Sequence, residues 1–375
     1  MTDSHAGRFF FPGPTEVHRE VLEAQLHPMI GHRGKGMEEL MARIQPPLRR
    51  VFRTARPVYV AASSATGFME GAVRNGVRRR VLSLVNGAFS ERFFTIARSC
   101  GVDAERLDVP WGSAHAPEML AGALRGGSFD AVTVVHSETS TGVLNPVAEL
   151  ARVAHAAGDV ALLVDSVTGV AGAECETDGW GLDFVLTGSQ KAFALPPGLA
   201  FGVATDALLA RAKANPARGT YFDFLEFEKN VHANQTPNTP ALSLLYALAV
   251  QLERIDREGM EARWARHLAM ARRTWAWVDE ARERGVALTL PVAEPCRSPT
   301  VTCIALPAGT TAGPVVSELK RRGFVVGAGY GKLKDTQLRI GHMGDHTVEE
   351  LDVLLDELLD VLLAVPAVPA AAAAR

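Results

Sequence analysis

Between about residues 57 and 205, short apolar runs rich in β-branched residues alternate with amphipathic helical stretches. Several runs are apolar at nearly every position, as expected for strands that are covered on both faces in a largely parallel sheet. Helical patterns such as 91–100 and 146–157 lie between most of them, which is the rhythm of a three-layer α/β domain. The predicted strands are 57–62, 81–85, 131–136, 161–165, 184–187 and 199–204.

The second half of the chain follows a different pattern. Two long helical stretches, at about 240–258 and 260–285, lead out of the α/β region, and a smaller α+β unit follows them. Together the patterns predict an α/β fold with a large three-layer domain, whose sheet is mostly parallel, and a smaller C-terminal α+β domain. The elements predicted for the smaller unit are strands at 300–305, 324–327 and 337–341 and helices at 313–322 and 347–363.

These patterns divide the chain into four parts. Residues 21–258 are predicted to form the large α/β domain, and residues 259–364 the small α+β domain. Residues 1–20 are an N-terminal segment, and the low-complexity sequence of residues 365–375 predicts a disordered tail. At 375 residues the chain is long enough for two such domains.

Composition and charge exclude several classes of protein. Hydrophobic residues make up 47% of the chain and charged residues 22%, which is an ordinary globular balance. The net charge of −3 gives no electrostatic reason to expect a nucleic-acid or membrane-surface partner. Because the apolar runs are too short to span a bilayer and no signal sequence stands at the N-terminus, we expect a cytoplasmic protein.

Several familiar catalytic and metal-binding motifs are missing from the sequence. The four cysteines are scattered outside any CxxC pair, so neither a metal site nor a disulfide framework is expected. No GxGxxG follows the first strand, and there is no GxSxG elbow and no HExxH, which removes the usual signals for hydride transfer, serine hydrolysis and zinc proteolysis. The glycine-rich stretch 327–332 precedes a strand rather than a helix, unlike a phosphate-binding loop.

Polar segments instead follow the predicted strands. The carboxyl ends of parallel strands meet at one edge of a sheet, where ligands bind. The segment 63–67 leads from strand to helix, so its amides and hydroxyls suit a phosphate, although a plain helix N-cap gives the same pattern. In the segment 86–92, Phe89 could present its ring to a flat heterocycle or simply join the core. The loop 136–142 combines hydroxyls and one carboxylate before a glycine.

Two charged residues also follow strands at this edge. Asp165 ends a strongly apolar strand, where a carboxylate would be costly without a cationic partner. Lys191 follows another such strand, with small and polar neighbours in Gly188-Ser-Gln-Lys191. A lysine in that position is either a solvated loop residue or an amine held for covalent catalysis.

The order and spacing of these segments resemble the class V family of pyridoxal-phosphate-dependent aminotransferases, of the alanine–glyoxylate and serine–pyruvate type. The resemblance covers nearly the whole chain and implies aminotransferase fold type I. Phe89 stands where some relatives carry Trp, and Ala65 stands where Gly is common. The matching strings are Pro12-Gly-Pro-Thr15, the Ser/Thr cup at 63–66, the loop 136–142, Asp165-Ser-Val167, Gly188-Ser-Gln-Lys191, Thr236-Pro-Asn-Thr239-Pro240 and Leu338-Arg-Ile-Gly341.

The resemblance implies a role for each matching residue. Lys191 would hold pyridoxal phosphate as a Schiff base and move the proton, and Asp165 would pair with the ring nitrogen and keep it protonated. Arg339 would bind the substrate carboxylate in two parallel bonds, and Gly13 of the N-terminal segment would also contact the substrate. No metal is implied. The other implied cofactor contacts are Ser64, Ala65, Thr66, Phe89, Thr139, Gln190 and, from the second subunit of a homodimer with shared active sites, Thr239.

The segment Gly31-His-Arg-Gly-Lys35 bears on the substrate, because in this family such a loop reaches the mouth of the active site. One interpretation is a generic entrance for small substrates, with alanine or serine as amino donor and glyoxylate or pyruvate as acceptor. The other is that His32 and Arg33 bind a second anion, since the string resembles one in phosphoserine aminotransferases. We favour the first interpretation.

Further alternatives are an aminoethylphosphonate transaminase, another amino donor, a family lyase and a non-catalytic member of the family. The intact Lys191, Asp165 and Arg339 argue against the non-catalytic alternative. A cysteine desulfurase would need a mobile catalytic cysteine near the C-terminus, and neither Cys296 nor Cys303 lies in the expected loop.

Overall fold

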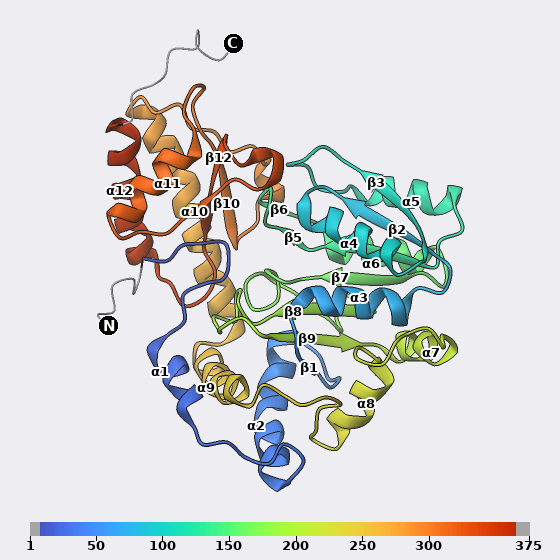
Figure 1. The fold of residues 1–375 in the computed structure, drawn as a ribbon. Helices are drawn as coiled ribbons and strands as arrows, with labels where there is room; N and C mark the ends of the chain where they lie inside the picture. The colour runs from blue at the N-terminus through green and yellow to red at the C-terminus, as the bar shows by residue number, and fades with distance from the viewer. Residues whose placement is uncertain (1–7, 365–375) are drawn as a thin grey trace.

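The computed structural model describes residues 8–364, which form a large α/β unit with a smaller unit beside it (Figure 1). The large unit is built on a seven-stranded sheet in which one strand, residues 199–204, runs antiparallel to both of its neighbours and all other pairs are parallel. In spatial order the strands are β1 (Tyr59–Ala62), β9 (Leu199–Ala204), β8 (Phe184–Gly188), β7 (Ala161–Asp165), β4 (Ala131–Val135), β2 (Arg80–Val85) and β3 (Asp103–Asp108).

Two layers of helices cover the sheet, because successive side chains of a strand point to opposite faces. In β7, for example, Leu162 and Val164 pack into one core and Leu163 into the other. The first face is covered by α2 (Lys35–Phe52), α5 (Pro117–Gly126), α6 (Val147–Ala156) and α9 (Leu242–Glu258). The second face is covered by α3 (Ala65–Gly76), α4 (Ala88–Ser99), α7 (Asp206–Ala214) and α8 (Phe224–His232).

The six strands predicted from the apolar runs are all present, each within two residues of its predicted bounds. The sequence did not predict β3, whose residues Asp103–Asp108 are mostly charged and largely exposed. It lies at the edge of the sheet, paired only with β2 among the described strands, and charged side chains are common on edge strands because they discourage pairing with another chain. An apolar pattern therefore could not reveal it.

The smaller unit is an antiparallel sheet covered by helices. Its strands are β10 (Val301–Ala305), β12 (Gln337–Gly341) and β11 (Gly327–Ala328), in that spatial order. The prediction of a strand at 324–327 was wrong in its bounds, because Val325 forms a bridge with Phe9 of the N-terminal segment instead of joining this sheet. The covering helices are α10 (Met260–Glu283), α11 (Ala312–Arg321) and α12 (Val348–Ala364).

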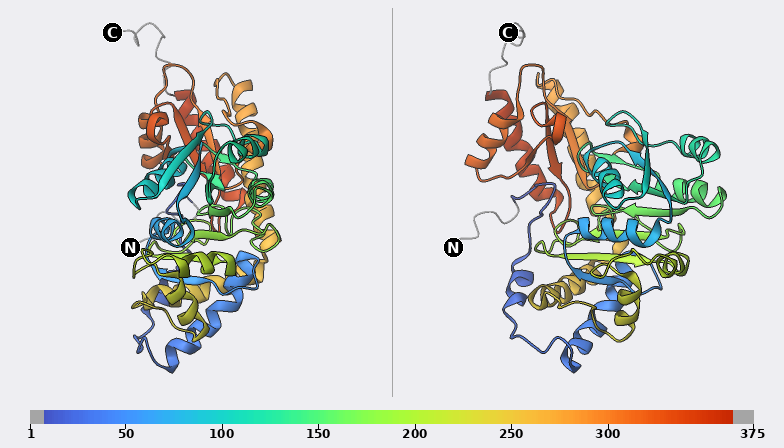
Figure 2. Two further views of the ribbon diagram at one scale, coloured as in Figure 1. Left: turned by 90° about the vertical axis from the view of Figure 1, so that its right-hand side faces the viewer. Right: turned by 45° about the vertical axis from the view of Figure 1, so that its right-hand side comes forward.

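The N-terminal segment, residues 8–15, lies between the two units, as a rotated view shows (Figure 2). The carbonyl of Phe10 accepts a hydrogen bond from Gly341 at the end of β12, and the amide of Thr15 donates to Gln190 beyond β8. The segment thus contacts both units. The remaining short elements are α1 (Arg19–Glu23), η1 (Ala24–Leu26), β5 (Ser137–Glu138), β6 (Val143–Leu144), η2 (Glu294–Cys296) and η3 (Gly331–Leu333).

Among the helices within residues 8–364, none is long and apolar enough to cross a membrane. The predicted disordered tail, residues 365–375, lies outside the described residues, as do the first seven residues of the N-terminal segment.

Candidate active site

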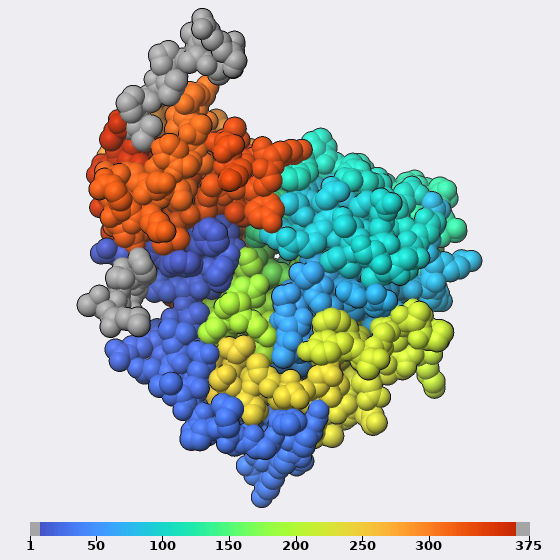
Figure 3. Space-filling view, in the orientation of Figure 1, coloured from blue at the N-terminus to red at the C-terminus, as the bar shows by residue number. Residues whose placement is uncertain are grey.

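A cavity of about 260 Å³ opens at the carboxyl ends of strands β1, β2, β4, β7 and β8. In the space-filling view the surface is hollowed there, where the smaller unit meets the segments that begin α3 and α4 (Figure 3). Because these five strands are parallel, the loops that follow them meet at one edge, as the sequence predicted. The lining includes nine of the candidate residues: Gly13, Ser64, Ala65, Thr66, Phe89, Thr139, Asp165, Gln190 and Lys191.

Lys191 follows β8 and extends into this cavity. Its Nζ donates to the carbonyl oxygen of Pro12 at 2.6 Å, and its own carbonyl accepts from the Thr15 hydroxyl at 3.0 Å and from the Ala194 amide at 2.8 Å. Burial lowers the pKa of the amine to about 8, and the positive charge of Arg339 acts in the same direction, against the opposing effect of Asp165. The amine is therefore partly neutral near physiological pH, as a nucleophile or base must be.

Gly13 is required beside this lysine. A Cβ atom at position 13 would lie 2.1 Å from Lys191 Nζ, and the φ angle of +106° is one that residues with a side chain rarely adopt. Glycine thus lets the N-terminal segment pass directly over the amine.

Asp165 ends β7 and is 2% exposed. Within the described residues its carboxylate accepts one hydrogen bond, from the Val167 amide at 2.9 Å. Burial, together with the nearby Glu138 carboxylate, raises the pKa of Asp165 to about 7, although the hydrogen bond from the Val167 amide opposes this shift. A buried carboxylate that accepts only this one hydrogen bond would be stabilised by a cationic partner in the cavity.

Phe89 is held at the mouth of the cavity by the start of α4. The carboxylate of Glu138, which is fully buried, accepts from the amides of Phe89 and Ser90, and the Ser140 hydroxyl accepts from the Ala88 amide. These bonds satisfy the first amides of the helix, where a negative charge is also favoured by the helix dipole. The carboxylate of the 136–142 loop therefore caps a helix instead of facing a ligand.

The start of α3 forms another wall of the cavity. Ser64 is the N-cap residue, with extended backbone angles, and Ala65 and Thr66 are the first helical residues. The Ser64 side chain makes no capping bond, so the plain N-cap alternative does not explain its hydroxyl. Together with Gln190 beyond β8, these residues place a helix N-terminus and polar side chains on the lining.

Arg339 lies on β12, in the smaller unit, and is 7% exposed. Its guanidinium donates to the carbonyls of Ala328 at 2.9 Å and Thr139 at 3.3 Å, and it lies 5.2 Å from the ring centre of Tyr330. Burial lowers its pKa, and no carboxylate within residues 8–364 forms an ion pair with it. Thr139 and Tyr330 line the cavity, so Arg339 stands at its edge with donors still available.

The sequence did not indicate two large polar side chains of the lining, those of Arg92 and Tyr330. Arg92 lies one helical turn after Phe89, 5.1 Å from the centre of its ring, and its guanidinium donates to the Tyr330 hydroxyl at 3.4 Å. The helical spacing from Phe89 could have indicated Arg92. Tyr330 comes from the smaller unit, and no local pattern indicated it. The other lining residues not predicted are Met69, Val135, Ser137, Val167 and Thr168.

Three candidate residues lie away from the cavity of their own chain. Arg33 donates to the carbonyls of Thr236 and, at 3.0 Å, Pro237. His32 precedes it, and Thr239 lines a separate small cleft beside β1. The 31–35 loop and the 236–240 segment are therefore neighbours on one surface. Within residues 8–364 no group of three or more His, Cys, Asp or Glu side chains could hold a metal ion.

The fold defines the class of protein. A mostly parallel sheet with a smaller α+β unit beside it is the arrangement of the aminotransferases of fold type I. The family model for aminotransferase class-V matches residues 94–340, so the chain belongs to that family and is an aminotransferase.

Similar proteins carry names of the same kind. The chain is 34% identical to an L-aspartate–glyoxylate aminotransferase of Paracoccus denitrificans, over 90% of this chain and 86% of that protein. It is 31% identical to a serine–glyoxylate aminotransferase of Methylorubrum extorquens, over 92% and 88%. An alanine–glyoxylate aminotransferase structure from Nostoc sp. has a TM-score of 0.89 at 29% identity, with 95% of each chain covered. A phosphoserine aminotransferase from Cytophaga hutchinsonii, with a TM-score of 0.84 at 24% identity, shares the fold.

Proposed function

We propose that this aminotransferase uses pyridoxal phosphate to move an amino group from a small L-amino acid, alanine or serine, to glyoxylate or pyruvate. The proposal rests on one observation: Lys191 and Asp165 line a single cavity that Arg339 borders, and the charges of Arg339 and Asp165 both act on the Lys191 amine. Relatives named for serine, alanine or aspartate with glyoxylate support the substrate class.

The residues around the cavity fit pyridoxal phosphate. The N-terminus of α3, with Ser64, Ala65 and Thr66, and the neighbouring Gln190 would hold the phosphate. At the far side, a protonated ring nitrogen would provide the cation that buried Asp165 lacks. Phe89 would stack on the ring, and Thr139 would bond its hydroxyl oxygen. When bound, the cofactor supplies an electron sink for the carbanion that is left when the α-proton departs.

The chain's own residues supply positioning and proton transfer. Lys191, with a pKa near 8, is neutral often enough to bond the cofactor and then to accept and return the α-proton. The Pro12 carbonyl and the Thr15 hydroxyl hold its side chain and its backbone in place. Arg339 would bind the substrate carboxylate with its planar fork, which orients the α-C–H bond toward the lysine.

A homodimer with shared active sites is part of the proposal. Thr239 and the 31–35 loop lie on one surface of the chain, away from its own cavity, so a second subunit could receive them. Because Arg33 already donates to two carbonyls, its bonds favour a loop-shaping role over a second anion clamp with His32. The four cysteines are free thiols, which fits the cytoplasmic location that we propose.

The test is a screen of amino donors and acceptors with purified protein and added cofactor. Alanine, serine, aspartate and phosphoserine would each be paired with glyoxylate and pyruvate, and Lys191→Ala serves as the inactive control. We expect the highest specificity constant for alanine or serine, with little change of the phosphoserine-to-alanine ratio in Arg33→Ala. A strong preference for phosphoserine that collapses in Arg33→Ala would replace the proposal, because losing a charged hydrogen bond to a phosphate costs about 1.5–3 kcal/mol.

A further inference from the structure

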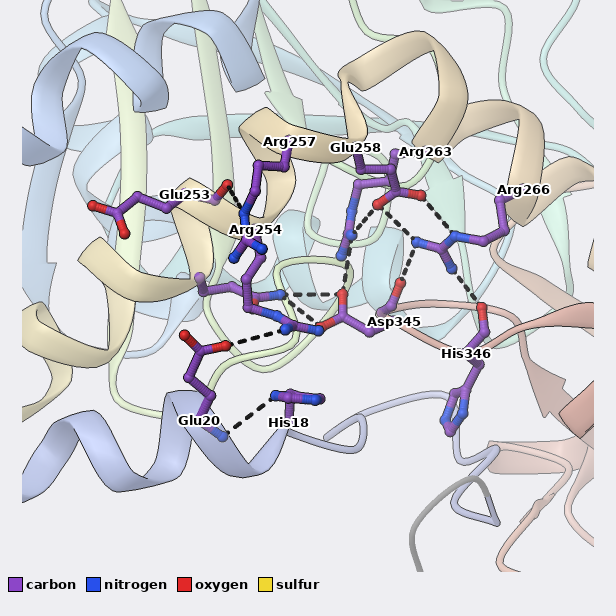
Figure 4. A network of polar contacts seen from close by, with 12 residues as sticks. His18, Glu20, Glu253, Arg254, Arg257, Glu258, Arg263, Arg266, Asp345 and His346 are labelled. Carbon is purple, nitrogen blue, oxygen red and sulfur yellow. Dashed lines mark hydrogen bonds and ion pairs between the residues drawn. The ribbon is translucent and has the colours of Figure 1, made fainter.

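Arginine and carboxylate side chains form a network where α9, α10 and the turn after β12 meet (Figure 4). The turn consists of residues 344–346. The network surrounds a cleft of about 280 Å³ that shares no lining residue with the active-site cavity. Its lining residues are Arg254, Arg257, Glu258, Arg263, Arg266 and Asp345.

Arg263 is the buried member of this network, with 1% of its surface exposed. One nitrogen, Nη1, donates to Glu258 at 2.8 Å and to Asp345 at 3.0 Å. The other, Nη2, donates to the carbonyl of Ala192 at 2.7 Å. Ala192 is the residue directly after Lys191, so this guanidinium holds the backbone one residue beyond the lysine.

The two segments joined by Arg263 carry the two functional cations. The first is the lysine loop, residues 189–195, which presents Lys191. The second is the 344–346 turn, which begins three residues after the end of the strand that presents Arg339. The segments also touch, since a Cβ atom on Gly344 would lie 3.3 Å from the Cβ of Ala194. If one segment shifted, it would therefore push against the other.

The ion pairs of Arg263 with Asp345 and Glu258 persist near neutral pH. Burial opposes ionisation of Asp345. The charges of Arg263 and Arg254 and the hydrogen bonds from Gln251 and Arg263 together outweigh burial, and the pKa of Asp345 falls to about 2. Glu258 likewise has a lowered pKa despite its burial, because Arg266 and Arg263 donate to it. Both carboxylates therefore remain charged, and the Arg263 cation has anionic partners.

We propose that Arg263 is a positioning residue for transamination: through the Ala192 carbonyl it fixes the loop that presents Lys191 relative to the strand that bears Arg339. An arginine is needed because its planar fork has donors on two sides, which a lysine ammonium on one stem cannot match. The inference rests on the proposed role of Lys191, but its structural part, the restraint on the lysine loop, can be measured without the cofactor.

Arg266 provides a matched control one turn further along α10. It also donates to Glu258, at 2.7 Å, and it holds the same turn through the carbonyls of Gly344, at 3.1 Å, and His346. It makes no bond to the lysine loop. Arg266→Met therefore weakens the turn and the carboxylate pairing alone, whereas Arg263→Met also frees the Ala192 carbonyl. Methionine keeps much of the packing of the arginine stem in both variants.

The first measurement is amide hydrogen exchange of the cofactor-free proteins. The amides of Ala194 and Leu195 bond to carbonyls within the lysine loop, so their exchange reports its order. In Arg263→Met we expect exchange at these amides to accelerate by about tenfold or more, as the loss of a charged hydrogen bond implies. In Arg266→Met the rates should stay within about threefold of wild type.

The second measurement is steady-state kinetics of the holoenzymes. Arg263→Met should lower kcat by about tenfold or more with a small change in KM, because the lysine is misplaced while Arg339 still binds the carboxylate. Arg263→Lys should recover part of kcat, since its charge is kept and one donor remains.

Three outcomes would overturn the inference: unchanged exchange and kcat in Arg263→Met, equal losses in Arg266→Met, or a loss confined to KM. If Arg263→Met does not fold, Arg263→Lys with normal exchange and normal kcat would also overturn it. If no variant, wild type included, is active with any donor, the proposed function fails, while the exchange result still decides whether Arg263 restrains the loop.

Discussion

Replacing Asp165 with asparagine should weaken function and, at neutral to alkaline pH, stabilise the cofactor-free protein. The residue is 2% exposed at the end of β7, and burial raises its pKa to about 7. Asparagine has nearly the same shape, carries no charge, and can still accept the bond that the Val167 amide donates at 2.9 Å. The substitution thus removes the buried charge and little else.

The sign and size of the effect follow from the pKa shift. Because the pKa of Asp165 is higher in the folded state than its ordinary value of 3.8, the folded state binds the proton more tightly, and stability falls as the pH rises from about 4 to 7. At 1.36 kcal/mol for each pH unit between these two pKa values, the loss of stability is roughly 4 kcal/mol at pH 8. Asp165→Asn should not suffer this loss.

The assay is urea unfolding of the cofactor-free proteins at several pH values between 4 and 8. The free energy of unfolding of Asp165→Asn minus that of wild type should grow with pH and level off above pH 7. Asp130→Asn is the control, because Asp130 is also buried, next to β4, but accepts from the amides of Arg78, Arg79 and Arg80. That variant should lose stability.

Function should change in the opposite direction. An amide cannot hold a ring proton as an ion pair does, so the single-turnover half-reaction of Asp165→Asn should be greatly slowed. Near-normal half-reaction rates, or an Asp165→Asn protein that is less stable than wild type by the same amount at every pH, would refute this reasoning and make the carboxylate a structural group.

Three other predictions test separate parts of the site. Gly13→Ala should weaken cofactor binding in a folded protein, measured by cofactor titration, because its Cβ would lie 2.1 Å from Lys191 Nζ and displace the amine, and because the φ angle of +106° strains a residue with a side chain; normal affinity would contradict the close approach. Glu138→Gln should lower thermal stability by about 1–3 kcal/mol and weaken cofactor binding, since Glu138 accepts from the amides that hold Phe89; an unchanged melting temperature would contradict this. Mixing Lys191→Ala protomers with Thr239→Ala protomers should restore some activity through hybrid sites, and a fully active monomer at assay concentration would argue against sharing.

The features that could be predicted from the sequence are the buried strands and the polar residues that end them. Strands such as β7 and β8 are covered on both faces, so they appear as apolar runs, and the polar residues that end them, Asp165 and Lys191, stand out against that background. Parallel pairing then places both at one edge of the sheet. The cavity and most of its lining follow from these two facts.

The parts that the sequence did not predict depend on contacts between distant segments. Tyr330 lines the cavity because the smaller unit packs against α4, and no pattern in the sequence predicts this contact. Arg263 looks like one of many arginines on an exposed helix, yet it is buried between Glu258, Asp345 and the lysine loop. Such residues become visible only when the two units are seen together.

The proposed covalent bond between Lys191 and the cofactor can be tested by reductive labelling. The purified protein, loaded with pyridoxal phosphate and reduced with borohydride, would be digested and its peptides mapped by mass spectrometry. We expect the pyridoxyl adduct on Lys191, whose amine is buried in the cavity with a pKa near 8, and no adduct at that position in Lys191→Ala. An adduct on Lys332 or Lys334, with Lys191 unlabelled, would contradict it.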